Sequence, residues 1–113
     1  MNWFSPSQRY FLFTGCTDMR KGFDGLCALV AGNMGKDVLS GDVFIFVNRP
    51  RNRMKLLVWD RTGFVVCCKR LEEGTFELPS DTRAELRWDE LVLILEGISL
   101  KSVRRRKRYS RTA

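Results

Sequence analysis

Three short apolar runs, separated by only a few turn-forming residues each, constrain the fold of this chain more than any other feature. They are DVFIFV (42–47), MKLLVW (54–59) and FVVCCKRL (64–71), and each has the length and the β-branched or aromatic content of a strand. The connections NRPRNR and DRTG (60–63) are too short for a crossover. The three runs therefore predict neighbouring antiparallel strands.

Further strands flank this unit on both sides. RYFLF (9–13) is rich in aromatic residues and predicts a first strand, and TFEL (75–78) predicts a short one that Pro79 stops. With the two helices described next, we expect an α+β fold. It is an antiparallel meander of about four strands, packed by one glycine-striped helix and a shorter C-terminal helix.

The first helix is predicted to begin at Thr17 or Asp18 and to end near Met34, before Gly35. Its apolar face recurs at helical spacing and consists of Met19, Phe23, Leu26, Cys27, Val30 and Met34. Gly22, Gly25 and Gly32 form a stripe beside that face, although each costs about 1 kcal/mol against alanine. The stripe indicates tight packing on the sheet, or else a docking groove for a partner chain or a phosphate backbone.

The second helix is predicted over Trp88 to Glu96, with Gly97 just past its end. Leu93 and Ile94 fall outside the predicted inner face, so the helix is apolar over most of its circumference. It is either buried between layers or in contact with a second chain. The predicted inner face consists of Trp88, Leu91, Val92 and Leu95.

The charge is distributed very unevenly along the 113 residues. The net charge is +7, from 20 basic and 13 acidic residues. The last 13 positions hold seven of the basic residues and no acidic one, so residues 1–100 carry 13 of each and are formally neutral. We expect one compact domain over 1–100 and a basic, disordered tail over 101–113.

The tail points to a polyanionic partner, and DNA is the partner we expect. If all seven cations met phosphates of duplex DNA, log K would fall with log salt at a slope of about −6. The alternative is a tail that only aids solubility. The residues predicted to bind nucleic acid here are Lys101, Arg104, Arg105, Arg106, Lys107 and Arg108, with Arg111 as the seventh cation.

A second basic group lies on the turn between the first two runs and on the following strand. Alternate residues share a face in extended chain, so these cations would line up on one side. Phe44 and Phe46 on the neighbouring strand could then stack on bases beside phosphate contacts. The alternative is that both rings belong to the core and the cations to a solvated turn. The cations concerned are Arg49, Arg51, Arg53 and Lys55.

Catalytic and metal chemistry find little support. The chain has no histidine, its acidic residues are scattered over different elements, and no phosphate-binding glycine loop occurs. The four cysteines lack the paired spacing of a zinc site, so we expect buried reduced thiols, no metal and no cofactor. No secretory signal or long apolar run is visible, which predicts a cytoplasmic, soluble protein without membrane contact.

Three stretches together resemble a known family. They are TDMRKGFDGL (17–26), GDVFIFVNRPRNRMKLLVWDRTGF (41–64) and KRLEEGTFELP (69–79), and LEGI (95–98) follows in order. The chain resembles the TnpB-type, Orf2-like accessory proteins of the bacterial insertion-sequence-sixty-six family. The positions that form the family signature here, as possible partner contacts, are Asp18, Met19, Arg20, Lys21, Gly22, Asp60, Gly63, Lys69, Arg70 and Leu71.

The resemblance implies a role in DNA transposition beside a separate, larger transposase that cuts and joins DNA. It supplies no catalytic residue and no cofactor. Within the segment TDMRKGFDGL, Arg20 and Asp24 are four apart on the predicted helix, which favours an ion pair unless they contact a partner. Cys67 and Cys68 depart from the family, which has larger aromatic side chains there. The basic tail lies beyond the well-matched part.

The sequence thus favours a non-catalytic accessory protein that binds nucleic acid through the tail and the hairpin and cooperates with a transposase. One alternative is a protein-interaction adaptor that bridges transposase subunits without touching DNA. Another is a catalytic subunit with an unrecognised carboxylate site, for which Asp60 would be the first residue to test. Self-association is left open by the sequence.

Overall fold

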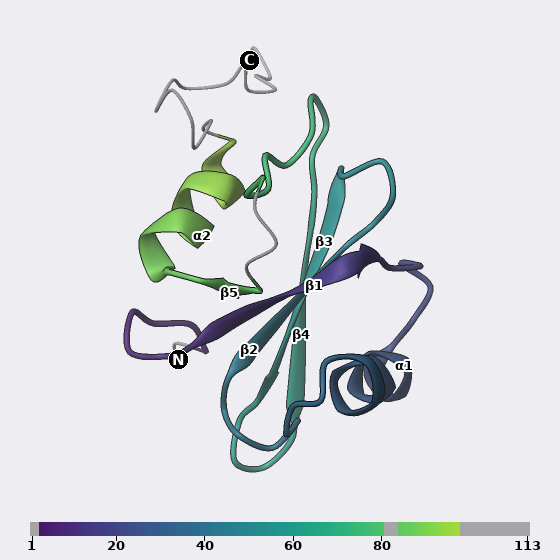
Figure 1. Cartoon of the computed structure of the whole chain (residues 1–113), viewed down its shortest axis with the longest axis vertical. Coiled ribbons are helices and arrows are strands. Elements are labelled where there is room, and N and C mark those ends of the chain that lie inside the picture. The colour runs from purple at the N-terminus through teal and green to yellow at the C-terminus, as the bar shows by residue number, and fades with distance from the viewer. Residues whose placement is uncertain (1–2, 81–83, 98–113) are drawn as a thin grey trace, which may run out of the picture.

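The computed structural model describes residues 3–80 and 84–97. A mixed five-stranded sheet carries one helix on each face, which confirms the α+β class (Figure 1). The sheet order is β4-β3-β2-β1-β5. The elements are β1 (Tyr10–Cys16), α1 (Phe23–Ala28) with its π-helical continuation η1 (Leu29–Asn33), β2 (Val43–Val47), β3 (Arg53–Trp59), β4 (Phe64–Arg70), β5 (Glu85–Leu86) and α2 (Trp88–Glu96).

The strands β2, β3 and β4 form the expected antiparallel meander, with Phe44 opposite Leu57 and Leu57 opposite Val66. The first strand is not part of it, because β1 pairs with β2 in parallel. The chain between them passes over one face through α1, which makes β1, α1 and β2 a crossover unit. The expected antiparallel meander of about four strands therefore comprises only three of the described strands, β2, β3 and β4.

The region after β4 also differs from the prediction. TFEL (75–78) is not a strand, although Phe76 is fully buried there. Its backbone N–H donates to the Arg51 carbonyl at 2.7 Å, so the segment is fixed across the β2–β3 turn instead of joining the sheet. The fifth strand is β5, only two residues long, which pairs antiparallel with Tyr10 and Phe11 of β1.

The first helix is shorter than the spacing predicted. It begins at Phe23, because Gly22 precedes it in an extended conformation and accepts the helical hydrogen bond from the Leu26 N–H. Asp18 and Met19 lie in the preceding loop, where the Asp18 carbonyl accepts a turn bond from Lys21. Met19 still packs on the same cluster as the helix, which is why the apolar pattern extended past the true helix start.

The glycine stripe does not pack on the sheet. A Cβ added at Gly22 or Gly32 would meet nothing within 4 Å, and both residues are exposed. The atoms nearest to a Cβ at Gly25 would belong to the Lys21 side chain. The expectation of tight packing is wrong, and the docking alternative stays a hypothesis.

The alternation of side chains on the strands divides the core into two clusters. On the α2 face, Leu91 and Ile94 pack on one set of strand residues, and on the α1 face Leu26 and Val30 pack on the other. The larger cluster comprises Tyr10, Leu12, Val43, Ile45, Val47, Met54, Leu56, Val58, Phe76, Leu86, Leu91 and Ile94. The smaller comprises Phe11, Leu26, Val30, Phe44, Phe46 and Leu57.

The second helix has the predicted bounds, and Gly97 ends it with a φ of 75°. The buried face of the helix differs from the predicted one, because Ile94 is fully buried beside Leu91. Val92 and Leu93 are half-buried and are not part of the core cluster. An outward-facing Ile94 was a wrong prediction, whereas Leu93 does lie away from the core.

Candidate nucleic-acid interface

The β2–β3 turn is built around one asparagine side chain. The Oδ1 of Asn48 accepts hydrogen bonds from the backbone N–H groups of Asn52 and Arg53, each at 3.0 Å. Its Nδ2 donates to the Asn52 side chain at 2.8 Å. Arg51 has a φ of 58°, in the left-handed region that L-residues rarely adopt. These contacts fix the backbone of a turn whose cations point into solvent.

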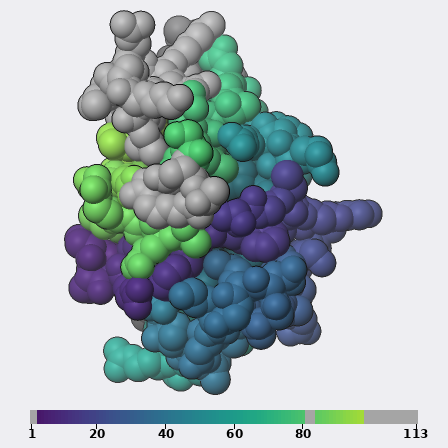
Figure 2. Space-filling model, in the orientation of Figure 1, coloured from purple at the N-terminus to yellow at the C-terminus, as the bar shows by residue number. Residues whose placement is uncertain are grey.

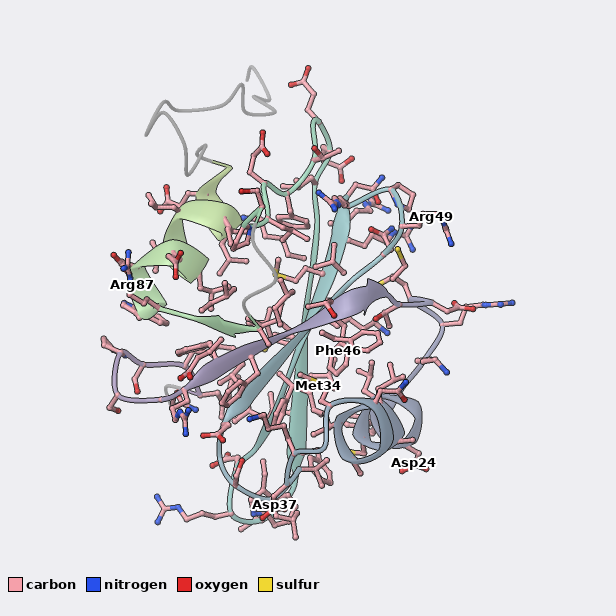
Figure 3. The ribbon with its side chains drawn as sticks, in the orientation of Figure 1. Asp24, Met34, Asp37, Phe46, Arg49 and Arg87 are labelled. Carbon is pink, nitrogen blue, oxygen red and sulfur yellow. The ribbon has the colours of Figure 1, made fainter. Side chains whose placement is uncertain are left out.

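Arg49, Arg51 and Arg53 are the exposed cations of this turn. Within residues 3–80 and 84–97 their guanidinium groups make no hydrogen bond or ion pair. Figure 3 shows Arg49 projecting from the turn at the margin of the molecule, whereas Phe46 lies within it. Three guanidinium groups on a fixed backbone are suited to contact phosphate oxygens.

The aromatic rings of the predicted interface are not available for stacking. Phe44 is 1% exposed and Phe46 is 0% exposed. Both belong to the core cluster under α1, with Phe46 in ring contact with Phe13. The alternative that these rings belong to the core is therefore confirmed. Any nucleic acid at this hairpin would meet cations and backbone, not a stacking platform.

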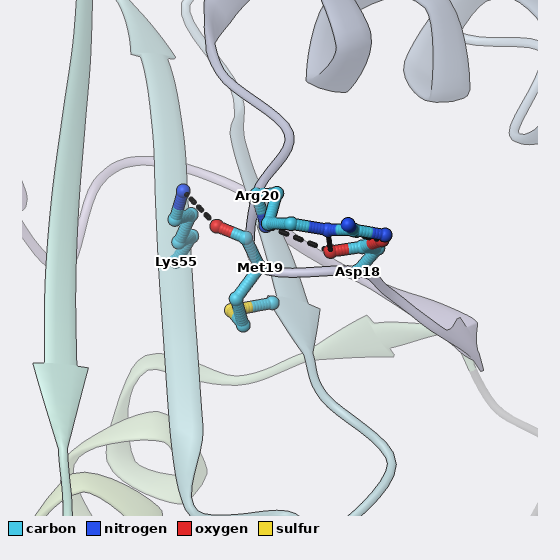
Figure 4. A network of polar contacts seen from close by, with 4 residues as sticks. All are labelled: Asp18, Met19, Arg20 and Lys55. Carbon is cyan, nitrogen blue, oxygen red and sulfur yellow. Dashed lines mark hydrogen bonds and ion pairs between the residues drawn. The ribbon is translucent and has the colours of Figure 1, made fainter.

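Lys55 differs from the three arginines. Its ammonium donates hydrogen bonds to the carbonyl oxygens of Met19 and Lys21, each at 2.8 Å, and Figure 4 shows the first of these. The lysine thus ties strand β3 to the loop between β1 and α1, 34 residues away in sequence. Its contacts connect the hairpin with the TDMRKG part of the family signature.

The same loop is ordered by a local ion pair. Both Asp18 carboxylate oxygens contact the Arg20 guanidinium, and one also accepts from the Arg20 backbone N–H at 2.9 Å (Figure 4). These hydrogen bonds hold the pKa of Asp18 well below its ordinary value. The predicted pairing of Arg20 with Asp24 is wrong, because Arg20 precedes the helix and pairs with Asp18 instead.

Lys21, Gly22 and Phe23 follow as exposed residues at the start of α1, and Phe23 remains 49% exposed. The β2–β3 turn and the β1–α1 loop lie at the surface on the same side of the molecule (Figure 2). Between the turn and the end of β1 lies a cleft of about 340 Å³, to which Arg51, Asn48 and Thr14 contribute polar groups. This side therefore combines exposed cations with a concave surface.

The remaining signature residues are divided between the two ends of the β3–β4 pair. Arg70 lies directly opposite Arg53 and pairs with Glu72 at 2.9 Å, so it belongs to the hairpin end. Asp60 and Gly63 form the β3–β4 turn at the other end, where Asp60 accepts a hydrogen bond from Trp3.

Lys69 points to the α2 face, where its ammonium donates to the Leu95 carbonyl at 2.7 Å. That contact stabilises the packing of α2 against β4, because a cation at the C-terminal end of a helix is favourable. The predicted tail residues Lys101 and Arg104 to Arg108 lie outside the described residues, so their role stays a prediction.

The four cysteines are free thiols, but none of them is fully buried, so the expectation of buried thiols is wrong. Cys27 and Cys67 are half-buried, and burial raises the pKa of each thiol. Cys16 and Cys68 are exposed. The described part of the chain contains no group of three acidic, cysteine or histidine ligands that could hold a metal ion, and none of its helices is long and apolar enough to cross a membrane.

Residues 8–105 match the family described as IS66 Orf2 like protein, which includes the whole sheet and both helices. The chain belongs to this family, and membership implies an accessory role associated with transposition of an insertion sequence. The family is generally non-catalytic.

Two curated relatives come from Sinorhizobium fredii (strain NBRC 101917 / NGR234) and are both described as uncharacterized. The protein y4jC is 31% identical over 104 residues, which are 90% of this chain and 89% of the relative. The protein y4hO is 36% identical over 72 residues, which are 64% of this chain and 63% of the relative. No solved structure matches the chain significantly.

Proposed function

We propose that this protein is a non-catalytic DNA-binding accessory factor that works beside the transposase of its insertion sequence. The observation that carries the proposal is the fixed β2–β3 turn, whose Arg49, Arg51 and Arg53 side chains have no partner within the described residues. Within the described part of the chain these three arginines do not stabilise the fold through ion pairs, so a contact outside the protein is the better explanation for their presence on one turn. Family membership supports the setting in transposition.

The chemistry favours contact with the phosphate backbone. The nearby rings of Phe44 and Phe46 are buried, so these two rings cannot stack on bases. Guanidinium groups bind phosphate oxygens through two parallel hydrogen bonds, and such contacts position a protein on a duplex without reading its sequence. The hairpin would then orient the body on DNA, and the basic tail would supply electrostatic affinity.

A salt titration of binding to the DNA ends of the element tests this function. Three chains are compared: the natural one, a chain with Arg49→Gln, Arg51→Gln and Arg53→Gln, and a chain ending at residue 100. If every cation contacts a phosphate, the slope of log K against log salt becomes shallower by about 3 in the hairpin variant and by about 6 in the truncated chain.

Arg87→Gln is a single-site control, because Arg87 is an exposed arginine on the opposite side of the molecule, where it pairs with Asp89 (Figure 3). It should leave the slope unchanged. A hairpin variant with the natural slope would refute the proposed role of the turn. If none of the chains binds DNA, the whole DNA-binding proposal fails.

A second function, an adaptor that bridges transposase subunits, is favoured by one different observation. Val92 and Leu93 on α2 are half-buried and take no part in the core. The adaptor function predicts that Leu93→Glu abolishes co-purification with the transposase while the DNA affinity of the isolated protein is unchanged. Leu91→Glu is not a suitable test, because Leu91 is fully buried and its loss would unfold the protein.

A further inference from the structure

Strand β4 is an open edge of the sheet. It lies first in the order β4-β3-β2-β1-β5, and no other strand of the described residues pairs with its outer side. It is seven residues long and regular, with an unbroken register from Phe64 to Arg70 against β3. A long regular edge presents unpaired backbone donors and acceptors, so it is a template for pairing with another strand.

The outward-pointing backbone groups can be identified from the turns. The backbone N–H of Asp60 donates to the Gly63 carbonyl at 2.8 Å, and the backbone N–H of Leu71 donates to the Asn52 carbonyl at 2.8 Å. Positions 60 and 52 flank β3, so the even-numbered residues of β3 form the hydrogen-bonded pairs with β4. In an antiparallel ladder the hydrogen-bonded and non-bonded pairs alternate. The residues of β4 that direct N–H and C=O groups outward are therefore Phe64, Val66, Cys68 and Arg70.

The edge carries few of the features that usually prevent pairing. Residues 64–68 contain no charge, no proline and no glycine, and they include β-branched valines. The only charges of β4 are Lys69 and Arg70, both at one end. In a parallel pair of two β4 strands these cations would repel each other, whereas an antiparallel pair keeps them apart.

We propose that β4 pairs antiparallel with β4 of a second copy of this chain, around a two-fold axis at Cys67. In this register Phe64 lies opposite Arg70 of the other copy, and Val66 lies opposite Cys68. All four outward residues then form hydrogen-bonded pairs, whereas registers centred on residue 66 or 68 use fewer of them. Arg70 would also lie against an aromatic ring, a favourable contact for a guanidinium.

This pairing has a geometric consequence for the proposed DNA contact, although it does not depend on it. A two-fold axis between antiparallel strands is perpendicular to the sheet, so both copies present their α1 faces on the same side. Strand spacing of about 4.8 Å and a rise of about 3.3 Å per residue place the two Arg53 positions roughly 25 Å apart. The dimer would thus hold two basic hairpins on one continuous ten-stranded sheet.

Disulfide trapping of full-length single-cysteine variants tests the register. Each variant retains one cysteine and has serine at the other three positions, and copper phenanthroline is the oxidant. Cys67 would face its own copy in a non-hydrogen-bonded pair with the Cα atoms about 4.5 Å apart, within the range of a disulfide. The Cα atoms of Cys68 and of Cys68 in the second copy would be about 8 Å apart, which is too far for a disulfide.

We therefore expect a covalent dimer from the Cys67 chain and little from the Cys68 chain. The opposite preference, or equal slow cross-linking of both and of the Cys16 chain, would overturn the proposal. The proposal is likewise overturned if β4 pairs only with the transposase, so that its amide hydrogens are protected from exchange only after the transposase is added.

Sedimentation equilibrium of the natural chain, Cys68→Pro and Cys68→Ala provides a second, independent test. Proline removes the outward N–H of residue 68 without removing a bond to β3, so it should break the dimer while the monomer stays folded by circular dichroism. Alanine keeps the N–H and should leave the dimer intact. A natural chain that is monomeric at all concentrations, or a Cys68→Pro chain that still dimerises, would refute the pairing.

Discussion

Lys55 determines the position of the β1–α1 loop. Its ammonium is hydrogen-bonded to two carbonyls of that loop, those of Met19 and Lys21. Because hydrogen bonds from charged donors contribute about 1.5–3 kcal/mol and this pair is partly exposed, we expect Lys55→Met to lower the free energy of unfolding by about 1–3 kcal/mol. Urea unfolding followed by tryptophan fluorescence measures this loss.

The control for Lys55 is Arg53→Met on the same face of β3. The Arg53 guanidinium has no partner among the described residues, so its replacement should change the free energy of unfolding by less than about 0.5 kcal/mol. Equal losses for the two variants would show that the lysine contributes only as an exposed side chain of the strand.

Asp18 gives the loop a dependence on pH. Its folded-state pKa is lowered from 3.8, first by side-chain and backbone hydrogen bonds from Arg20. A depressed carboxyl pKa contributes stability at pH values above 3.8, and this contribution is lost as the pH falls through the folded-state value. We expect Asp18→Asn to reduce stability at pH 7 and to weaken its decline in acid.

Thermal unfolding between pH 7 and pH 2 measures this effect. Arg20→Gln removes the guanidinium contacts but keeps the backbone N–H that donates to Asp18, so it should reproduce the larger part of the Asp18→Asn profile. The double variant should lose little more than either single variant, because the two residues interact with each other. Additive losses would mean that each side chain acts through a different partner.

At the scale of single elements, the β2–β3 turn combines backbone strain with exposed charge. Arg51 has a φ of 58°, and Arg61 in the β3–β4 turn has a φ of 50°. Glycine adopts such angles without a steric penalty, so Arg51→Gly and Arg61→Gly should each stabilise the fold by up to about 1 kcal/mol. Only Arg51→Gly should also weaken DNA binding, if the hairpin contacts phosphate.

Arg51→Gly and Arg61→Gly form a matched pair, because each replaces an arginine in the left-handed conformation by glycine. Denaturant unfolding and DNA titration at one fixed salt concentration separate the two effects. If both variants weaken DNA binding equally, the loss reflects total charge and not the place of Arg51 on the hairpin. If neither is stabilised, the left-handed conformation is not a source of strain in these turns.

The elements that could be predicted from the sequence are those whose signal is local. The three central strands and α2 have continuous apolar runs and clear ends, such as Gly97 with its left-handed φ. The parallel pairing of β1 with β2 was missed, although a helix between two strands is the pattern of a crossover unit. The strand β5 has only two residues, too few for a period to be recognised.

The candidate interface was only partly predictable for a related reason. The exposed guanidinium groups of the hairpin follow from their place in a turn. The role of Lys55 depends on a loop 34 residues earlier in the chain, and no spacing in the sequence indicates that contact. The aromatic content of VFIFV signalled a strand but did not distinguish a displayed face from a buried one, and Phe44 and Phe46 are buried.

At the scale of the whole molecule, the alkylation rates of the four cysteines depend on both folding and self-association. Cys27 and Cys67 are half-buried, and burial raises the pKa of each, so their thiolate fractions are reduced. Cys16 and Cys68 are exposed. In dilute natural protein we therefore expect iodoacetamide to alkylate Cys16 and Cys68 faster than Cys27 and Cys67, because the thiolate is the reactive form.

Raising the protein concentration should change the alkylation rate of one cysteine, Cys68. If β4 strands pair around Cys67, the Cys68 side chain lies opposite Val66 of the second copy and becomes shielded, whereas Cys16 at the end of β1 is far from the pairing edge in the sheet order. Peptide mass spectrometry at matched reagent ratios should show a slower reaction at Cys68 and an unchanged one at Cys16. Equal rates at Cys68 across all concentrations would mean that β4 remains an open edge, available to a strand of another protein.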